Sequence, residues 1–237
     1  MRVPPEPLLV INFKAYLEAT GKRAVRLAKS AAEVSRETGV SIIIAPQFTD
    51  IKAVTEEVDI PVFSQHIDSI KPGAFTGYVS AEAVKASGAD GTMLNHSERR
   101  LDDSKIGESV ILARGAELLS LVCADNPKRS GVVATYDPDM IAIEPPDLIG
   151  TGVSVSKARP ELLTNSIGEI RKINANVTVL CGAGITTAED VSKALQLGTR
   201  GVLVASSIVK AKNPKLVIES MAQAMLKMSV RDVLASG

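Results

Sequence analysis

Side chains that could move a proton follow several apolar segments of this 237-residue chain. Glu144 comes directly after the apolar run 140–143, and two prolines and a glycine-punctuated segment come after it. A carboxylate at the end of a buried run, beside a segment that could close over it, is typical of a general base with a lid. Lys14 and His96 follow other apolar runs and would supply a cation and an imidazole. These residue types and their positions therefore indicate acid–base chemistry.

His96 is one of two histidines in the chain, and a charged turn over residues 97–100 follows it. If this turn opens a helix, the helix N-terminus would favour the neutral imidazole, which can donate a hydrogen bond. A lone histidine in an apolar strand is more often structural, and His66 keeps that interpretation. We expect His96 to be a neutral electrophile.

Glycine-rich and serine-rich segments follow the last two apolar runs, at 182–184 and 205–207. Backbone N–H groups and a short helix N-terminus in such loops are a common phosphate site of barrel enzymes. The lid glycines Gly150 and Gly152 add to this pattern. A base, a neutral electrophile, a cation and an anion cradle together predict proton transfer next to the carbonyl of a small phosphorylated substrate.

Eight apolar runs must position these residues, and helix-like sequence follows each one. They start near residues 8, 41, 61, 91, 118, 140, 177 and 201. Alternating βα units predict an α/β protein with a parallel sheet, and eight units predict a closed (β/α)8 barrel spanning residues 1–237 as a single domain. An open doubly wound sheet is the alternative, but no run is followed by G-x-G-x-x-G. We expect helices at 22–38, 50–57, from 80, 105–117, 126–135, 160–174, from 186 with a Thr186–Glu189 capping box, 214–226 and 230–234.

Composition narrows the class of protein further. Hydrophobic residues make up 45% and aromatic residues 3%, so the core must be aliphatic, as in parallel strands buried on both faces. A net charge of zero gives no reason to expect nucleic-acid or membrane binding. Cys123 and Cys181 lie in apolar runs and are expected to be buried free thiols, with no metal site. Neither a signal peptide nor a spanning segment is recognisable, which predicts a cytoplasmic protein.

Three motifs together resemble the triosephosphate isomerase family over essentially the whole chain. They are Asn12-Phe13-Lys14, the run from Asn95 to Arg100, and Glu144-Pro145-Pro146 followed by the run from Leu148 to Gly152. The resemblance implies a TIM barrel that needs no cofactor and no metal. It implies interconversion of dihydroxyacetone phosphate and glyceraldehyde 3-phosphate through an enediolate, a step of glycolysis and gluconeogenesis.

The resemblance also implies a role for each matching residue. Glu144 would transfer the proton and His96 would polarise the carbonyl. Lys14 would hold the substrate anion beside Asn12. Further residues complete the implied site: Glu98 and Asn95 in support of the catalytic groups, main-chain groups of Ile149, Gly184, Ala205 and Ser206 on the phosphate, and a lid over about 144–158.

The chain departs from the wider family in ways that resemble its archaeal branch. Pro146-Asp147-Leu148 stands where most of the family has a lid tryptophan, and the ends of the seventh and eighth strands differ. The resemblance to the archaeal branch implies a homotetramer rather than the homodimer of the wider family. The loop 73–77, which contains Thr76, is similar to the loop that reaches into a neighbouring subunit.

Other functions compete with this interpretation. Another phosphate-binding barrel isomerase would explain the glycine-rich strand ends. A Schiff-base aldolase would use Lys14 as its nucleophile. A non-catalytic barrel that binds a sugar phosphate would have no need for a base, an electrophile and a lid together.

Overall fold

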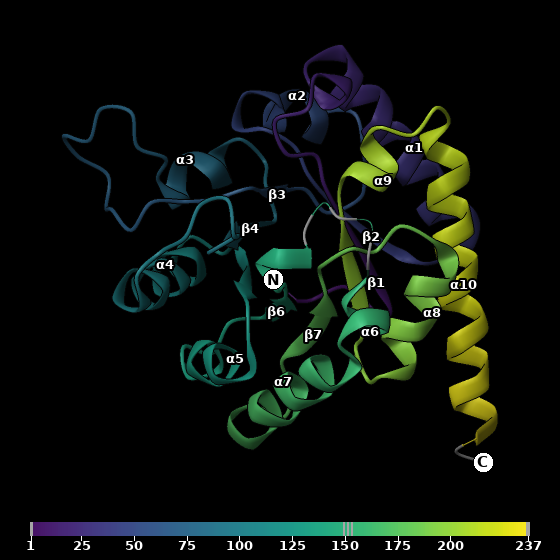
Figure 1. Ribbon diagram of the computed structural model, residues 1–237. Coiled ribbons are helices and arrows are strands. Elements are labelled where there is room, and N and C mark those ends of the chain that lie inside the picture. Colours follow the sequence, from purple (N-terminus) through teal and green to yellow (C-terminus); the bar gives the residue numbers. More distant parts are fainter. Residues whose placement is uncertain (1, 149, 151, 153, 236–237) are drawn as a thin grey trace.

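A ring of eight parallel strands lies at the centre of the computed structural model, and helices surround it (Figure 1). The structure describes residues 2–148, 150, 152 and 154–235, with only the backbone at 229–235. The expected (β/α)8 barrel is confirmed. The strands are β1 (Leu8–Asn12), β2 (Ser41–Ala45), β3 (Phe63–Ser64), β4 (Gly91–Leu94), β5 (Leu119–Ala124), β6 (Met140–Ile143), β7 (Thr178–Cys181) and β8 (Gly201–Val204).

The strands follow the order β2-β1-β8-β7-β6-β5-β4-β3, and every pair is parallel. Between β2 and β3 the ring is completed by one isolated bridge, Ile44 to Val62, and by the Ile44 N–H, which donates to the Pro61 carbonyl at 3.1 Å. We call this place the β2–β3 seam. The third strand was expected to start near residue 61 and starts instead at Phe63, because Pro61 has no N–H and the Val62 N–H donates to the Asp90 carboxylate at 3.0 Å.

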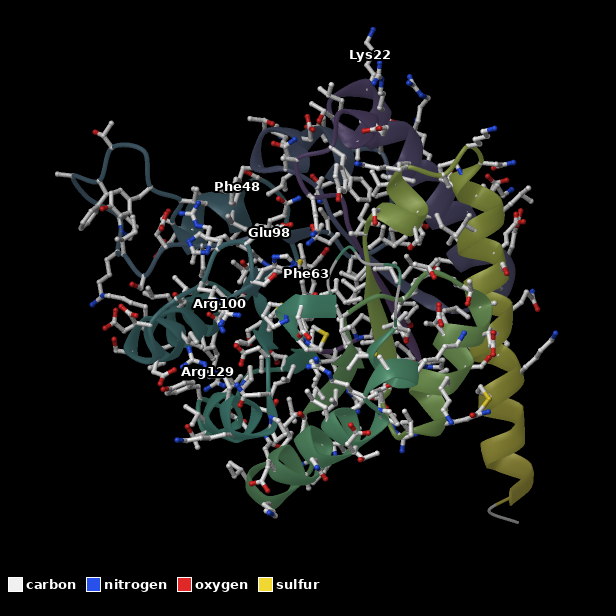
Figure 2. The ribbon with its side chains drawn as sticks, viewed as in Figure 1. Lys22, Phe48, Phe63, Glu98, Arg100 and Arg129 are labelled. Carbon is white, nitrogen blue, oxygen red and sulfur yellow. The ribbon has the colours of Figure 1, made fainter. Side chains whose placement is uncertain are left out.

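Aliphatic side chains alternate between the two faces of each strand. Leu8 and Val10 point into the barrel, where Phe63 also lies, while Leu9 and Ile11 pack outward against the helices. Figure 2 shows Phe63 near the middle of the view. Gly91 makes room for it, because a Cβ at this position would lie 2.5 Å from Cζ of the Phe63 ring. Side chains fill the interior of the barrel, so we look for the functional residues at its rim.

The helices cover the outside of the ring, and the long α10 forms one edge of the molecule (Figure 1). Among the described residues, none of them is long and apolar enough to span a bilayer. The helices are α1 (Lys22–Thr38), α2 (Ile51–Thr55), α3 (Ala81–Ala86), α4 (Asp103–Gly115), α5 (Pro127–Ala134), α6 (Val155–Ala158), α7 (Pro160–Ile173), α8 (Ala188–Gln196), α9 (Ser206–Val209) and α10 (Pro214–Ala235), with 3-10 turns η1 (Leu17–Ala19), η2 (Phe48–Asp50) and η3 (Pro146–Leu148).

Two helix predictions were wrong in detail. The capping box of α8 pairs Thr187 with Asp190, one residue later than expected, because the Asp190 carboxylate also accepts from Thr186 and so fixes the start of the helix. The two pieces expected at 214–226 and 230–234 are one helix, since no glycine or proline interrupts the sequence between them.

Candidate active site

The polar residues that follow different strands meet at one cavity at the carboxyl end of the barrel. About 530 Å³ of free space lies there, which includes the solvent at its open mouth. Ile149, the other expected phosphate contact, lies outside the described residues. The cavity is lined by the expected Asn12, Lys14, His96, Glu144, Gly184, Ala205 and Ser206.

Lys14 follows β1 and is held by polar partners on two sides. Its ammonium Nζ lies 2.7 Å from the Glu98 carboxylate, and its side chain is 13% exposed. Its backbone N–H donates to the Asn12 Oδ1 at 2.9 Å. Figure 2 shows Glu98 on the segment that follows β4, so two strand ends cooperate to place one cation. Glu98 thus contacts Lys14, as the resemblance implied.

The His96 ring is buried and has a defined tautomer. The Glu98 backbone N–H donates to His96 Nδ1 at 3.2 Å. A nitrogen that accepts carries no proton, so in the neutral ring the proton is on Nε2. His96 Nε2 lies 3.7 Å from the Glu144 Oε2. In that tautomer the ring presents an N–H donor toward the Glu144 carboxylate and the cavity.

The charged residues after His96 do not open a helix. Residues 97–99 form a turn, in which the Arg99 N–H donates to the His96 carbonyl at 2.8 Å, and α4 begins only at Asp103. Asn95, directly before His96, has a φ of +58°, in the left-handed region. The donor to the imidazole is thus the N–H group of a turn rather than a helix terminus.

Asn95 clamps the turn that carries His96. Its Nδ2 donates to the Cys123 carbonyl at 2.8 Å, and its Oδ1 accepts from the Leu101 N–H at 2.9 Å. Both ends of the side-chain amide are therefore used, one on β5 and one beyond the turn. This arrangement holds residues 96–101 against the barrel rim.

Glu144 follows β6 and is almost completely buried, with 4% of its surface exposed. Burial raises the pKa of its carboxyl group, and the neighbouring His96 and the hydrogen bond from the Cys123 thiol partly oppose that rise. Among the described residues, its Oε2 has no hydrogen-bond partner. A buried carboxylate with an unused oxygen beside an N–H donor is suited to accept a proton.

Gly182, the first residue after β7, has a role that the sequence interpretation missed. It lies in the segment 182–184 that we expect to bind an anion, and it lines the cavity. It also makes room for Glu144, because a Cβ at this position would lie 2.9 Å from Glu144 Cδ and 3.0 Å from Oε1. The Glu144 carboxyl group therefore occupies the space that a side chain at residue 182 would fill. A glycine directly after a strand was the available signal, but it did not indicate which neighbour needed the space.

The opposite wall of the cavity is built from the ends of β7 and β8. Gly184 has a φ of +69°, and α9 begins at Ser206, directly after β8 and Ala205. The N–H groups of the first turn of a helix have no partners within the helix. Ala205, Ser206 and Ser207, where α9 begins, line the cavity. The Ser207 hydroxyl fixes this wall by donating to the Ile185 carbonyl at 3.1 Å.

The segment expected to be a lid begins with η3 and ends with α6. Gly150 and Gly152 line the cavity, with φ values of +75° and +76°. At its end, the Val155 N–H donates to the Ala183 carbonyl at 3.1 Å. Asp147, where most of the resembled family has tryptophan, forms a double-contact ion pair with Arg159. The two ends of the segment are thereby joined.

Other cavity residues had no signal in the sequence. Tyr16 and Thr186 line the cavity although neither directly follows a strand. The pKa of the Cys123 thiol is raised by burial and by the Glu144 carboxylate, so it remains protonated. Both cysteines are buried and free, as expected. In the part of the chain that the structure describes, no cluster of three or more His, Cys, Asp or Glu residues could hold a metal ion.

Known proteins match the chain along most of its length. The family model for triosephosphate isomerase matches residues 7–225. Triosephosphate isomerases of Methanothermus fervidus, Methanosarcina barkeri and Methanocaldococcus jannaschii are 46%, 48% and 48% identical to it, over 91%, 91% and 90% of this chain and 97%, 97% and 98% of those proteins. All three sources are archaea.

A solved structure, that of triosephosphate isomerase from Bartonella henselae, matches with a TM-score of 0.75 at 19% identity and covers 93% of this chain and 99% of that one. At this identity it supports the fold alone. The family model and the archaeal relatives support more than the fold, because they match the sequence over the strands and loops that build the cavity. The chain therefore belongs to the triosephosphate isomerase family and is an isomerase.

Proposed function

We propose that this isomerase interconverts dihydroxyacetone phosphate and D-glyceraldehyde 3-phosphate through an enediolate. One observation supports the proposal most directly. The His96 Nε2 lies 3.7 Å from the buried Glu144 carboxylate, in a cavity that also contains the Lys14 ammonium. Base, electrophile and cation therefore surround one small space.

The proton transfer follows from these positions. Glu144 takes a proton from C1 of dihydroxyacetone phosphate, and the electron pair forms the C1–C2 double bond. The carbonyl oxygen gains negative charge, which the His96 Nε2–H and the Lys14 ammonium stabilise. His96 then moves the hydroxyl proton between the two oxygens, and Glu144 returns its proton to C2. A raised pKa makes Glu144 a stronger base than a solvated carboxylate.

The phosphate group would bind at the opposite wall of the cavity. Main-chain N–H groups of Gly184, Ala205 and Ser206 are its donors, with Asn12 beside Lys14. The segment of about 144–158 would act as the lid, and Ile149 would add a main-chain contact when it closes. A closed lid excludes water and limits loss of phosphate from the enediolate.

The contacts of Lys14 argue against the aldolase alternative. A Schiff base requires a free amine, and the Lys14 Nζ is paired with the Glu98 carboxylate at 2.7 Å. An ammonium group held in this way is a substrate-binding cation rather than a nucleophile.

We further propose that the protein is a cytoplasmic homotetramer of single-domain chains, rather than a homodimer. The loop between β3 and α3 extends away from the barrel (Figure 1). Its base is closed by the Val79 N–H, which donates to Asp68 at 2.7 Å. Phe75 and Tyr78 are 46% and 57% exposed on either side of Thr76. Exposed aromatic side chains on a closed loop are suited to bind a neighbouring copy.

A coupled assay with glyceraldehyde 3-phosphate tests the proposed reaction. Glu144→Ala should lower kcat at least about 10³-fold, since a positioned base contributes roughly 10²–10⁴. Glu169→Ala, which removes an exposed carboxylate on α7, is the matched control and should keep the wild-type rate. The anion 2-phosphoglycolate should bind the wild type more tightly than inorganic phosphate does, because it resembles the enediolate. A near-normal rate for Glu144→Ala would refute the assignment of the base.

A further inference from the structure

Lys14 has a backbone conformation that its own side chain disfavours. Its φ is +49°, in the left-handed region that residues other than glycine and asparagine rarely adopt. Such a conformation persists only when surrounding groups impose it. The peptide groups on both sides of the Lys14 Cα must therefore be held in place.

Two side-chain amides hold them. The Asn12 Oδ1 accepts from the Lys14 N–H at 2.9 Å. The Gln65 Nε2 donates to the Lys14 carbonyl at 3.0 Å. Asn12 is the last residue of β1, the strand that Lys14 follows. Gln65 directly follows β3, which lies on the other side of β2. Gln65 is therefore the independent support.

The same amide nitrogen has a second partner. Gln65 Nε2 also donates to the Ala45 carbonyl at 3.0 Å, and that carbonyl accepts from the Phe13 N–H as well. A primary amide has two N–H donors, and both are used here. They connect the ends of β1, β2 and β3 at the β2–β3 seam, beyond the single backbone bridge at Ile44 and Val62.

We propose that Gln65 is a positioning residue for Lys14, which fixes the left-handed backbone from which the ammonium reaches the substrate. This inference rests on the proposed function of Lys14. With Gln65 in place, the Lys14 backbone is held by two amides and its ammonium by Glu98. Without Gln65, the carbonyl loses its donor and the residue relaxes toward a right-handed or extended conformation. The ammonium then leaves its place in the cavity.

Gln65→Met tests this, because methionine has a similar length and shape but no donor. In the otherwise wild-type enzyme we expect kcat/KM to fall roughly tenfold, with KM raised and 2-phosphoglycolate bound more weakly, since misplacement by about 1 Å can cost up to 10²-fold. In a Lys14→Met background the same substitution should have no further effect. Gln47→Met is the matched control, because the Gln47 amide donates to Thr20 rather than to Lys14. It should leave kcat/KM unchanged.

This double-mutant cycle of Gln65→Met and Lys14→Met distinguishes a role of Gln65 in positioning Lys14 from a general role in the stability of the barrel. An equal loss of kcat/KM with and without Lys14, or no loss in the wild type, would overturn the proposal. If Gln65→Met does not fold, Gln65→Asn keeps the amide but is one methylene too short to reach both carbonyls, and the same cycle applies. If neither variant folds, Gln65 serves the barrel alone and the proposal fails. If the wild type does not isomerise glyceraldehyde 3-phosphate, the proposed function fails, while the effect of Gln65 on phosphoglycolate binding still decides this inference.

Discussion

Gly182→Ala should damage catalysis while leaving the fold intact. The φ of Gly182 lies outside the left-handed region, so alanine suits its backbone. The new Cβ would instead overlap the base, at 2.9 Å from the Glu144 Cδ and 3.0 Å from Oε1, with Cγ closer still. Ordinary contact begins at 3.4 Å, so Cδ must move by at least 0.5 Å. Cγ must move by roughly 1 Å, and such a misplacement can cost about 10²-fold in rate.

The expected loss in kcat/KM is therefore about 10²-fold, or about 2.7 kcal/mol of transition-state stabilisation. This is smaller than the loss for Glu144→Ala, because a displaced carboxylate still accepts protons. Overpacking should lower the free energy of unfolding by only about 1–3 kcal/mol. A coupled assay gives the rates, and urea denaturation gives the stability.

Gly168→Ala is the matched control for this substitution. A Cβ on Gly168, inside α7, would have no neighbour within 4 Å. Alanine there should preserve the rate and stabilise the helix by roughly 0.5–1 kcal/mol. If Gly182→Ala keeps the wild-type kcat/KM, the position of Glu144 is not limited by the space at residue 182, and the reasoning is refuted.

Three further predictions concern ionisation and assembly. The kcat/KM should fall as pH decreases, with a midpoint above 4.5, the ordinary pKa of glutamate. The reason is that burial raises the pKa of Glu144 and only its carboxylate form can accept the proton; a pH–rate profile measures the midpoint. Because that pKa is higher in the folded than in the unfolded chain, the stability that the protonated carboxyl contributes is lost as pH rises through the folded pKa. Glu144→Gln should therefore raise Tm at neutral pH, and calorimetry should show the advantage vanish toward pH 4.5. Thr76→Arg should place a charge between Phe75 and Tyr78 and reduce the assembled mass in sedimentation velocity, and an unchanged mass would exclude this loop from the interface.

The barrel could be predicted from the sequence because each apolar run is a local signal. Aliphatic residues of a buried strand and the helix that follows it lie close together in the chain, so the start of the first strand at Leu8 and the helix at 22–38 were predicted correctly. Parallel closure then places every strand end at one rim, which explains why Lys14 and Glu144 meet.

The remaining features depend on contacts between distant segments. The role of Gly182 depends on Glu144, 38 positions earlier, and the role of Gln65 depends on a carbonyl 51 positions away. The short third strand depends on Asp90, whose carboxylate takes the Val62 N–H. The turn after His96 depends on the Asn95 side chain, which bonds the Cys123 carbonyl and the Leu101 N–H. Each of these features depends on the place of a single side chain, and the periodicity of apolar residues carries no information about that.

The pairing of β1 with β8 determines when a chain that is being synthesised can first become active. Leu8 pairs with Gly201, so the first strand to be made completes its ladder only with the last. At 5–20 residues per second, a ribosome makes β8 roughly ten to forty seconds after β1. Lys14 and Ser206 flank this junction, so a nascent chain that lacks β8 lacks one wall of the proposed phosphate site. Activity on the ribosome should therefore appear abruptly, once the eighth strand has left the exit tunnel.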